Sequence, residues 1–270
     1  LKTIADKGLL YKGYKIVPYC PRCGTALSSH EVAQGYKDVK ETSVFVKFKF
    51  KGEDNKFFLA WTTTPWTLPN NMALCMNPNE KYVEILAEDG STYVLAEVLA
   101  PKYFENYQVL SVKTGKEYEY TEYEPLFDFV VDKIKEKAYY LTVADYVTME
   151  DGTGIVHIAP TFGADDAFVA RAAGIPSLFM INKRGETRPM VDFTGKFWSI
   201  DELDEEFVNN CIDKELYSKF AGAYVKNAYD PQYTVDGKYD EKAAAKAETL
   251  DIVLCMVLKQ AGVAFKIEKH

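Results

Sequence analysis

The chain has 270 residues, of which 47% are hydrophobic and 27% are charged. This composition supports a large folded core and excludes disorder as the default state. The formal net charge of −8 excludes a strongly basic surface of the kind that binds nucleic acid without sequence preference. No stretch approaches the roughly 20 apolar residues of a membrane span, and the first residue is Leu1, so we expect a soluble piece of a longer protein.

The opening part of the chain, residues 1–42, is expected to be a connector. Its first 14 residues have a helix-like spacing of apolar side chains, and residues 14–19 alternate like a short strand. This strand leads into Cys20 and Cys23, which form a Cys-x-x-Cys pattern typical of half a zinc ribbon. Structural zinc requires four ligands, and no second pair lies at a suitable spacing, so Cys20 and Cys23 are at most an incomplete half-site.

The five cysteines form an odd and scattered set. Cys75 and Cys255 lie within apolar runs, where a thiol packs as a small hydrophobic group. A reducing, cytoplasmic setting fits this pattern best.

Apolar and charged residues alternate from residue 43 to residue 50, which predicts a half-buried strand. A turn at residues 52–55 leads into residues 57–61, so the two segments are expected to form a hairpin. Further strands are predicted at residues 72–76, 82–87, 92–95, 107–112, 138–143, 155–159 and 177–181. Helices are predicted at residues 164–173, 201–211 and 241–260.

These elements predict a mainly β fold with peripheral helices (α+β). Strands do not alternate regularly with crossover helices, so a doubly wound nucleotide fold is disfavoured. A closed or nearly closed β-barrel is preferred, because closure removes exposed strand edges. We expect a connector with the Cys-x-x-Cys half at residues 1–42, a β-barrel core with helices at residues 43–225, and a C-terminal helix with a return connector at residues 226–270.

Residues 61–71 form the first unusual segment, Trp-Thr-Thr-Thr-Pro-Trp-Thr-Leu-Pro-Asn-Asn. Four hydroxyls and two amides directly follow a predicted strand, and two prolines restrict the backbone. Such a density of polar groups indicates a rigid wall of a pocket. The same segment also fits a simple turn with threonines chosen for strand propensity.

Residues 151–160 form a glycine-flanked strand that carries one histidine, His157. The chain then begins a helix with two adjacent carboxylates, Asp165 and Asp166. A helix N-terminus favours an ionised carboxylate, which is suited to hold the ammonium group of a ligand. Taken alone, these residues also fit helix capping and an ordinary structural histidine. We assign Asp165 to capping and give Asp166 a functional role only in the company of the threonine segment and His157.

Together the two segments resemble the editing (connective peptide) domain of isoleucyl-tRNA synthetases, which belong to the class I family. The resemblance rests on the first segment and on Gly-Thr-Gly-Ile-Val-His-x-Ala-Pro at residues 152–160, followed by the two aspartates. It extends over nearly the whole chain. Leucyl and valyl relatives have an arginine in the first motif at the position that Thr64 occupies here.

The resemblance implies a β-barrel inserted into the nucleotide-binding domain of a synthetase, with a pocket for the aminoacylated 3′-terminal adenosine of tRNA. The catalytic positions implied in this chain are Thr62, Thr63, Thr64 and Asp166. The implied substrate-binding positions are Trp61, Thr67, Asn71, His157 and again Asp166. Some relatives complete the zinc site with cysteines downstream of the insertion, so no metal is expected at Cys20 and Cys23 in this chain.

The implied activity is hydrolytic proofreading, in which an aminoacyl-tRNA deacylase removes valine from the tRNA for isoleucine. We expect Asp166 to hold the α-ammonium group, while the hydroxyls and backbone amides of residues 62–64 fix the carbonyl and the attacking water. His157, beside Trp61, is expected to exclude the extra methylene of isoleucine, and this steric role ranks above general-base assistance.

The signatures of ATP-dependent synthesis, the HIGH-type and KMSKS-type motifs and a phosphate-binding loop, are absent from the sequence. No cofactor is therefore expected in this chain, and ATP and magnesium belong to the synthetic site of a full synthetase. The expected partners are the aminoacylated 3′ end of tRNA and the rest of the synthetase chain, with no membrane contact and a monomeric state.

Two other functions stay open at this point. One is an editing domain of the valyl or leucyl type. The other is a non-catalytic module that docks the acceptor end of tRNA.

Overall fold

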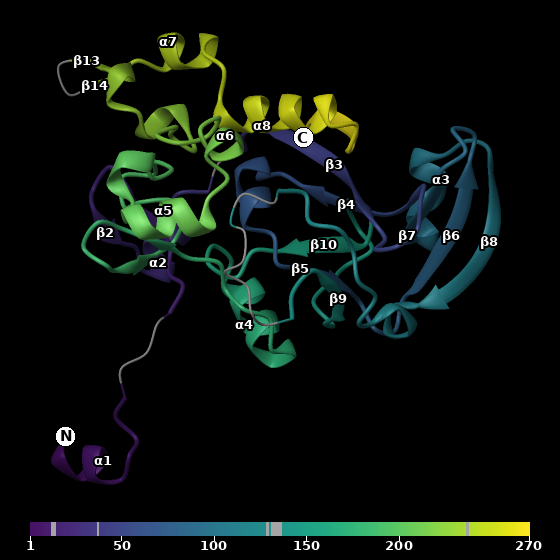
Figure 1. The fold of residues 1–270 in the computed structure, drawn as a ribbon, viewed down its shortest axis with the longest axis horizontal. Helices are drawn as coiled ribbons and strands as arrows, with labels where there is room; N and C mark the ends of the chain where they lie inside the picture. Colours follow the sequence, from purple (N-terminus) through teal and green to yellow (C-terminus); the bar gives the residue numbers. More distant parts are fainter. Residues whose placement is uncertain (12–14, 37, 128–129, 131–136, 236–237) are drawn as a thin grey trace.

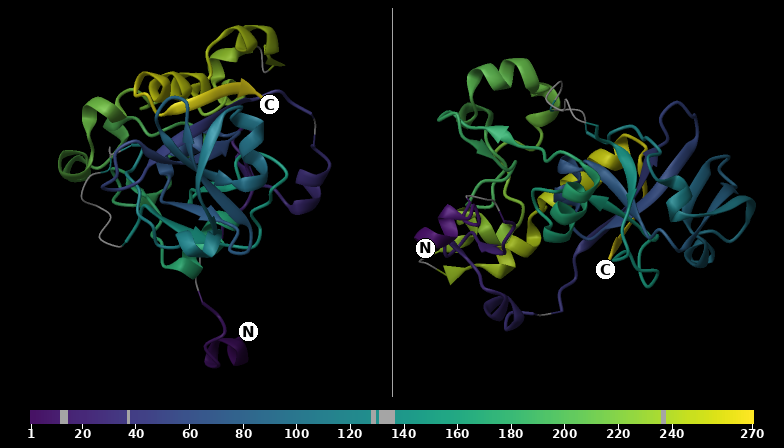
Figure 2. Two further views of the ribbon diagram at one scale, coloured as in Figure 1. Left: turned by 90° about the vertical axis from the view of Figure 1, so that its right-hand side faces the viewer. Right: turned by 90° about the horizontal axis from the view of Figure 1, so that it is seen from below.

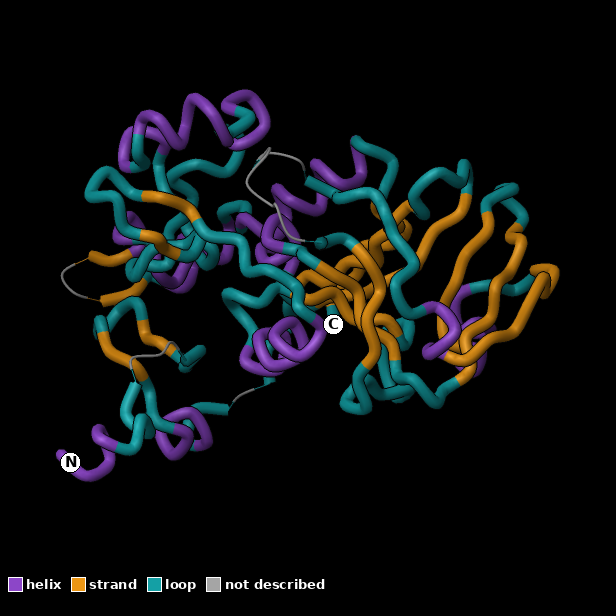
Figure 3. Tube along the Cα trace, turned by 60° about the horizontal axis from the view of Figure 1, so that its bottom comes forward, coloured by secondary structure: helices purple, strands orange, loops and turns teal. Residues whose placement is uncertain are grey.

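The computed structural model describes residues 1–11, 15–36, 38–127, 130, 137–235 and 238–270 (Figure 1). Strands gather at one end of the molecule, and several of the helices gather at the other (Figure 3). The N-terminal helix α1, Lys2–Asp6, lies apart from both groups (Figure 1). Among the described residues, no helix is both long and apolar enough to cross a membrane.

The larger sheet has six strands in the order β15-β3-β4-β7-β6-β8. Its central hairpin pairs β3, Thr42–Lys49, with β4, Lys56–Thr62, as predicted. All of its ladders are antiparallel except the one between β4 and β7. The other strands are β6 (Lys81–Ala87), β7 (Thr92–Ala96), β8 (Tyr107–Thr114) and β15 (Ala264–Lys269).

The smaller sheet has three strands in the order β10-β5-β9, formed by β5 (Ala73–Met76), β9 (Tyr140–Val143) and β10 (Ile155–Ile158). Strand β10 runs antiparallel to β5 with His157 opposite Leu74, and β9 runs parallel to β5. Isolated bridges from Glu122 to Tyr140 and from Tyr123 to Phe50 tie the smaller sheet to the β3 end of the larger one.

The two sheets enclose a shared apolar core. The alternating residues Val44, Val46 and Phe48 of β3 are buried in it, as the sequence pattern requires. Leu74 of β5 and Leu141 of β9 reach the same core from the smaller sheet. The prediction of a mainly β fold with peripheral helices is confirmed.

Helices and short two-stranded ribbons surround the sheets. Helix α8 (Leu250–Gln260), the longest one among the described residues, packs against the larger sheet beside β15 (Figure 2). The other helices are α2 (Ser29–Ala33), α3 (Ala100–Tyr103), α4 (Ala164–Ala173), α5 (Glu205–Cys211), α6 (Lys214–Tyr217) and α7 (Glu241–Lys246). The 3-10 turns are η1 (Pro65–Asn70), η2 (Glu97–Leu99), η3 (Gly115–Tyr118), η4 (Ile200–Glu202), η5 (Asn227–Tyr229) and η6 (Pro231–Tyr233). The ribbons are β1 (Tyr19–Cys20) with β2 (Thr25–Ala26), β11 (Met180–Ile181) with β12 (Thr187–Arg188), and β13 (Thr234–Val235) with β14 (Lys238–Tyr239).

Some boundaries differ from the sequence prediction. Residues 241–260 form two helices, because Thr249 caps a new helix with its hydroxyl oxygen 3.4 Å from the amide of Ile252. The helix predicted at residues 201–211 begins at Glu205, where Asp204 accepts the Phe207 N–H. The strand predicted at residues 177–181 is confined to β11. Of the strand predicted at residues 14–19, residue 14 lies outside the described residues, and only Tyr19 is in a strand.

Candidate functional site

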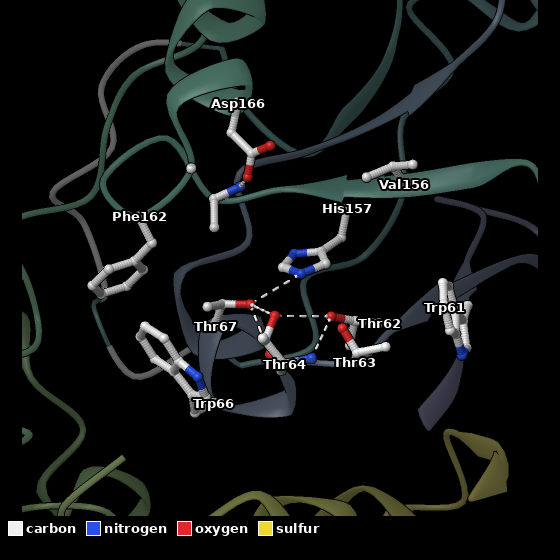
Figure 4. Close-up of a pocket in the computed structure, with 12 residues that line it drawn as sticks. Trp61, Thr62, Thr63, Thr64, Trp66, Thr67, Val156, His157, Phe162 and Asp166 are labelled. Carbon is white, nitrogen blue, oxygen red and sulfur yellow. Dashed lines mark hydrogen bonds between the residues drawn. The ribbon is translucent and has the colours of Figure 1, made fainter. Parts of the chain in front are cut away.

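A cavity of about 380 Å³ opens between strand β4, the turn η1, strand β10 and the start of helix α4 (Figure 4). It brings together residues from both unusual sequence segments, which lie about 90 positions apart. The lining consists of Trp61, Thr62, Thr63, Thr64, Trp66, Thr67, Val156, His157, Ala159, Phe162, Gly163 and Asp166.

The threonine-rich wall of the cavity is held by its own hydrogen bonds. The backbone N–H of Thr64 donates to Oγ1 of Thr62 over 3.1 Å, and the hydroxyls of the two residues lie 3.3 Å apart. The hydroxyl of Thr67 donates to the carbonyl oxygen of Thr64 over 2.8 Å, and the same carbonyl accepts the backbone N–H of Thr67 in the first turn of η1. The predicted rigid wall is therefore a network of hydroxyls anchored to backbone groups.

His157 is 7% exposed and projects from β10 toward this wall. Its Nε2 lies 3.1 Å from Oγ1 of Thr67. Donation of the Thr67 proton to the Thr64 carbonyl favours Nε2 as the donor in this contact. Nδ1 is buried and has no hydrogen-bond partner among the described residues. Burial lowers the pKa of His157 to about 4, so the ring is neutral at pH 7 and is a weak proton acceptor there.

Asp166 lies at the opposite side of His157 from the threonine wall (Figure 4). Its Oδ2 accepts the backbone N–H of Ala159 over 2.8 Å, which leaves Oδ1 for a ligand. Burial raises the pKa of Asp166 to about 6, while the hydrogen bond from Ala159 opposes this effect. At pH 7 the group is therefore mostly an ionised, partly desolvated carboxylate, which favours a cationic ligand.

Gly163 makes room for the carboxylate of Asp166. A Cβ atom at Gly163 would lie 2.6 Å from Cγ and 2.7 Å from Oδ2 of Asp166. Gly163 is also the N-cap of α4, and it has no side chain with which to cap the helix. The sequence interpretation of Asp165 as the cap is therefore wrong, because Asp165 is an exposed residue in the first turn.

Trp61 closes one end of the cavity. Its ring lies 5.1 Å from the ring of His270 in an edge-on arrangement. A Cβ atom at Gly152, whose φ is +68°, would lie 2.7 Å from the indole, so the glycine allows the turn before β10 to pass against Trp61.

Asn71 does not line the cavity, although we expected it to contact substrate. Its Nδ2 donates to the carbonyl oxygen of Ala73, and its Oδ1 accepts the hydroxyl of Tyr123 over 2.6 Å. With both ends of the amide used and 5% of the residue exposed, Asn71 is a structural residue beneath the wall.

Several lining residues were not singled out from the sequence. Trp66 and Phe162 form an edge-on aromatic pair with ring centroids 4.9 Å apart at the cavity margin. Val156, Ala159 and Gly163 present small or apolar surfaces between the polar groups. Trp66, Val156 and Ala159 lie within the two motifs, and Phe162 and Gly163 follow the second one. Nothing in the sequence pattern separates these residues from residues that only support the fold.

Cys20 and Cys23 lie in and just after β1, where the backbone N–H of Cys23 lies 3.4 Å from Sγ of Cys20. This contact lowers the pKa of the Cys20 thiol. Among the described residues, no group of three or more His, Cys, Asp or Glu side chains is placed to hold a metal ion.

The chain belongs to the class I tRNA synthetases that act with isoleucine, leucine, methionine and valine (I, L, M and V), because that family matches residues 1–230. Curated proteins similar to this chain include isoleucine–tRNA ligases. The one from Bacteroides thetaiotaomicron is 50% identical and is matched by 100% of this chain. The one from Clostridium kluyveri is 51% identical over 81% of this chain. These relatives confirm the resemblance found in the sequence.

The chain spans only about a quarter of these relatives, 27% of the first and 21% of the second. Two solved structures are similar at low identity. The crystal structure of GlLeuRS-CP1 is 13% identical, covers 83% of this chain and 96% of its own, and has a TM-score of 0.49. The editing domain of the cytosolic leucyl-tRNA synthetase of P. falciparum is 13% identical, covers 84% and 99%, and has a TM-score of 0.46.

Proposed function

We propose that this chain is the editing domain of an isoleucine–tRNA ligase and hydrolyses the ester between valine and the tRNA for isoleucine. The observation that carries this proposal is the cavity itself. One carboxylate, one network of threonine hydroxyls and one neutral histidine face a space of about 380 Å³. That combination suits a small, cationic amino acid esterified to a sugar.

Asp166 is assigned to the α-ammonium group of the aminoacyl ester. An ionised carboxylate in a partly desolvated place is stabilised by a cation that replaces its lost water. His157 is the other titratable side chain that lines the cavity. It is neutral at pH 7 because burial lowers its pKa to about 4. The ammonium therefore meets no competing positive charge from His157.

The threonine wall is assigned to the ester carbonyl and the attacking water. Thr62, Thr63 and Thr64 supply hydroxyl donors and acceptors within one short segment. Water adds to the carbonyl carbon, and the products are free valine and the ribose hydroxyl of tRNA. Because the ester is already labile, positioning and stabilisation of the developing oxyanion suffice, and no covalent nucleophile is assigned.

A separate editing site is needed because binding energy limits how well the synthetic site of the ligase can reject valine. One methylene is worth only about 1–3 kcal/mol in an apolar pocket, a limit for which the isoleucine enzyme is itself the standard example. His157 and Trp61 are assigned to the size limit of the editing cavity. A neutral ring locked to Thr67 is a fixed wall, and we rank this role above proton transfer.

The partners follow from the same proposal. The aminoacylated 3′ end of tRNA enters the cavity, and the rest of the synthetase supplies most of the tRNA affinity, since the net charge of this chain is −8. No cofactor is assigned to this chain, and ATP and magnesium serve the synthetic site elsewhere in the ligase. We propose a monomer in the cytoplasm.

Deacylation of purified valyl-tRNA and isoleucyl-tRNA, both carried on the tRNA for isoleucine, tests the proposal on the full-length protein. Rapid release of valine with slow release of isoleucine is expected. Release of neither amino acid, with tRNA still bound, would favour a docking module. Preferred release from a valine or leucine tRNA would favour the valyl or leucyl type.

A further inference from the structure

Helix α8 contributes a carboxylate to the back of the threonine wall. Oδ1 of Asp251 accepts the backbone N–H of Trp66 over 2.9 Å, although the two residues are 185 positions apart. Asp251 is 2% exposed, and it lies in the first turn of α8. It does not line the cavity, so it acts on the cavity only through the turn that it holds.

The turn η1 needs such an acceptor. Its N-cap is Thr64, which makes no side-chain capping hydrogen bond, and its first residue is Pro65, which has no N–H. The N–H of Thr67 is satisfied by the carbonyl of Thr64 over 3.0 Å. The N–H of Trp66 therefore depends on an external acceptor, which a cap would normally supply. Asp251 supplies it from another helix.

Lys226 holds the carboxylate in this position. Nζ of Lys226 donates to Oδ2 of Asp251 over 2.9 Å and also contacts the carboxylate of Glu41. Burial raises the pKa of Asp251, and the Lys226 cation opposes that effect and favours the ionised form. The two oxygens of Asp251 thus have separate tasks, one toward Trp66 and one toward Lys226.

The consequences of this contact reach the functional side chains. Trp66 lies between Thr64 and Thr67, and the hydroxyl of Thr67 meets Nε2 of His157. A shift of the turn would move the hydroxyl wall and the histidine together. Misplacements of about 1 Å cost up to about 100-fold in rate at a reacting centre.

We propose that Asp251, held by Lys226, is a positioning residue of the candidate site that sets the threonine wall by accepting the Trp66 N–H. This proposal rests on the proposed function and adds a residue from the predicted C-terminal connector to the machinery of hydrolysis. Asp251 contacts no substrate in this assignment.

Three variants of the full-length protein test the positioning role. Asp251→Ala removes the acceptor, and kcat for valyl-tRNA should fall about tenfold or more with KM changed less than about threefold. Asp251→Asn keeps an oxygen for the Trp66 N–H but turns an amide NH2 toward Lys226, so it should recover only part of the lost kcat. Asp204→Ala is the matched control, because Asp204 caps α5 in the same manner, 2.8 Å from the Phe207 amide, and lies outside the cavity.

The comparison with the control separates positioning from general stability. Thermal unfolding of all three variants gives the folded fraction at the assay temperature. A wild-type kcat in folded Asp251→Ala would overturn the proposal. The proposal would also be overturned if the loss of kcat in Asp251→Ala, like that in Asp204→Ala, equalled the fraction of unfolded protein at the assay temperature.

A spectroscopic measurement keeps the inference separate from the proposed function. The backbone amide of Trp66 and the ring nitrogens of His157 are followed by NMR in wild type and in Asp251→Ala. The proposal expects both signals to move. Failure of the wild type to release valine would overturn the proposed function. Unchanged NMR signals of His157 and Trp66 in Asp251→Ala would overturn the positioning role as well.

Discussion

The hydroxyl oxygen of Thr67 lies 3.1 Å from Nε2 of His157. This contact joins the two sequence segments that meet in the cavity, and it orients the histidine ring. The neutral histidine is thereby held in one orientation. Five predictions rest on this contact and on the geometry around it.

Replacement of Thr67 by valine should release the histidine ring. Valine has a similar shape but neither donates to the Thr64 carbonyl nor accepts from Nε2, so we expect a loss of about 1–3 kcal/mol in unfolding free energy. Nitrogen NMR of the His157 ring should change from the Nε2–H tautomer to a mixture. Thr67→Ser keeps the hydroxyl and serves as the control. An unchanged tautomer in Thr67→Val would contradict the assignment of the proton.

Asp166→Asn should abolish deacylation of valyl-tRNA without unfolding the chain. The asparagine oxygen still accepts the Ala159 N–H, but the negative charge that holds the ammonium is lost, so we expect a fall of about 100-fold or more in kcat/KM. The exposed neighbour provides the control, because Asp165→Asn should stay within about twofold of wild type. Near wild-type hydrolysis by Asp166→Asn would remove the ammonium anchor.

The same substitution should not lower stability at pH 7. The raised pKa of Asp166 means that the folded chain binds its proton more tightly than the unfolded chain does. Proton binding to Asp166 therefore adds to the free energy of unfolding at low pH. This contribution is lost as the pH rises through about 6. Melting curves of Asp166→Asn and wild type between pH 4 and pH 8 check this sign.

Hydrolysis should depend on pH through Asp166 rather than through His157. The carboxylate becomes neutral below its pKa of about 6, whereas the histidine ring stays neutral down to about 4. We expect the rate of valyl-tRNA hydrolysis to fall about tenfold per unit below pH 6, after subtraction of the spontaneous rate. An acid limb that persists unchanged in the residual activity of Asp166→Asn would assign the ionisation to another group.

His157→Ala should relax the size limit of the cavity. The smaller side chain leaves room for the extra methylene of isoleucine, so hydrolysis of isoleucyl-tRNA should rise about tenfold or more relative to valyl-tRNA. His157→Gln retains most of the volume and should keep the discrimination. The ratio of the two deacylation rates is the measurement, and an unchanged ratio in His157→Ala would exclude the steric role.

The sequence predicted much of this site because its residues are contiguous within two segments. Thr62, Thr63, Thr64 and Thr67 lie on one wall, and His157 and Asp166 face them, as expected from the two motifs. Helix α4 was predicted with its observed ends because Gly174 closes it in the left-handed conformation.

The errors concern contacts that local patterns do not encode. Asn71 matched the motif, yet its side-chain amide is hydrogen-bonded to Ala73 and Tyr123 and points away from the cavity. Asp251 lies 185 residues from Trp66, and a single acid in an apolar helix carries no sequence signal of that pairing. The break at Thr249 was missed because apolar periodicity continues across it, and only the cap reveals the new helix.

The pairing of β10 with β5 places His157 opposite Leu74, and side chains on a strand alternate between its two faces. One residue added or removed within β10 would therefore turn the imidazole away from the cavity and bring a neighbouring apolar side chain into its place. The number of residues between the glycines Gly152 and Gly154 and Pro160 is therefore constrained more strictly than the identity of those residues. Selection on this strand should tolerate substitutions and reject insertions, and length changes should accumulate in exposed turns such as the one at Gly90.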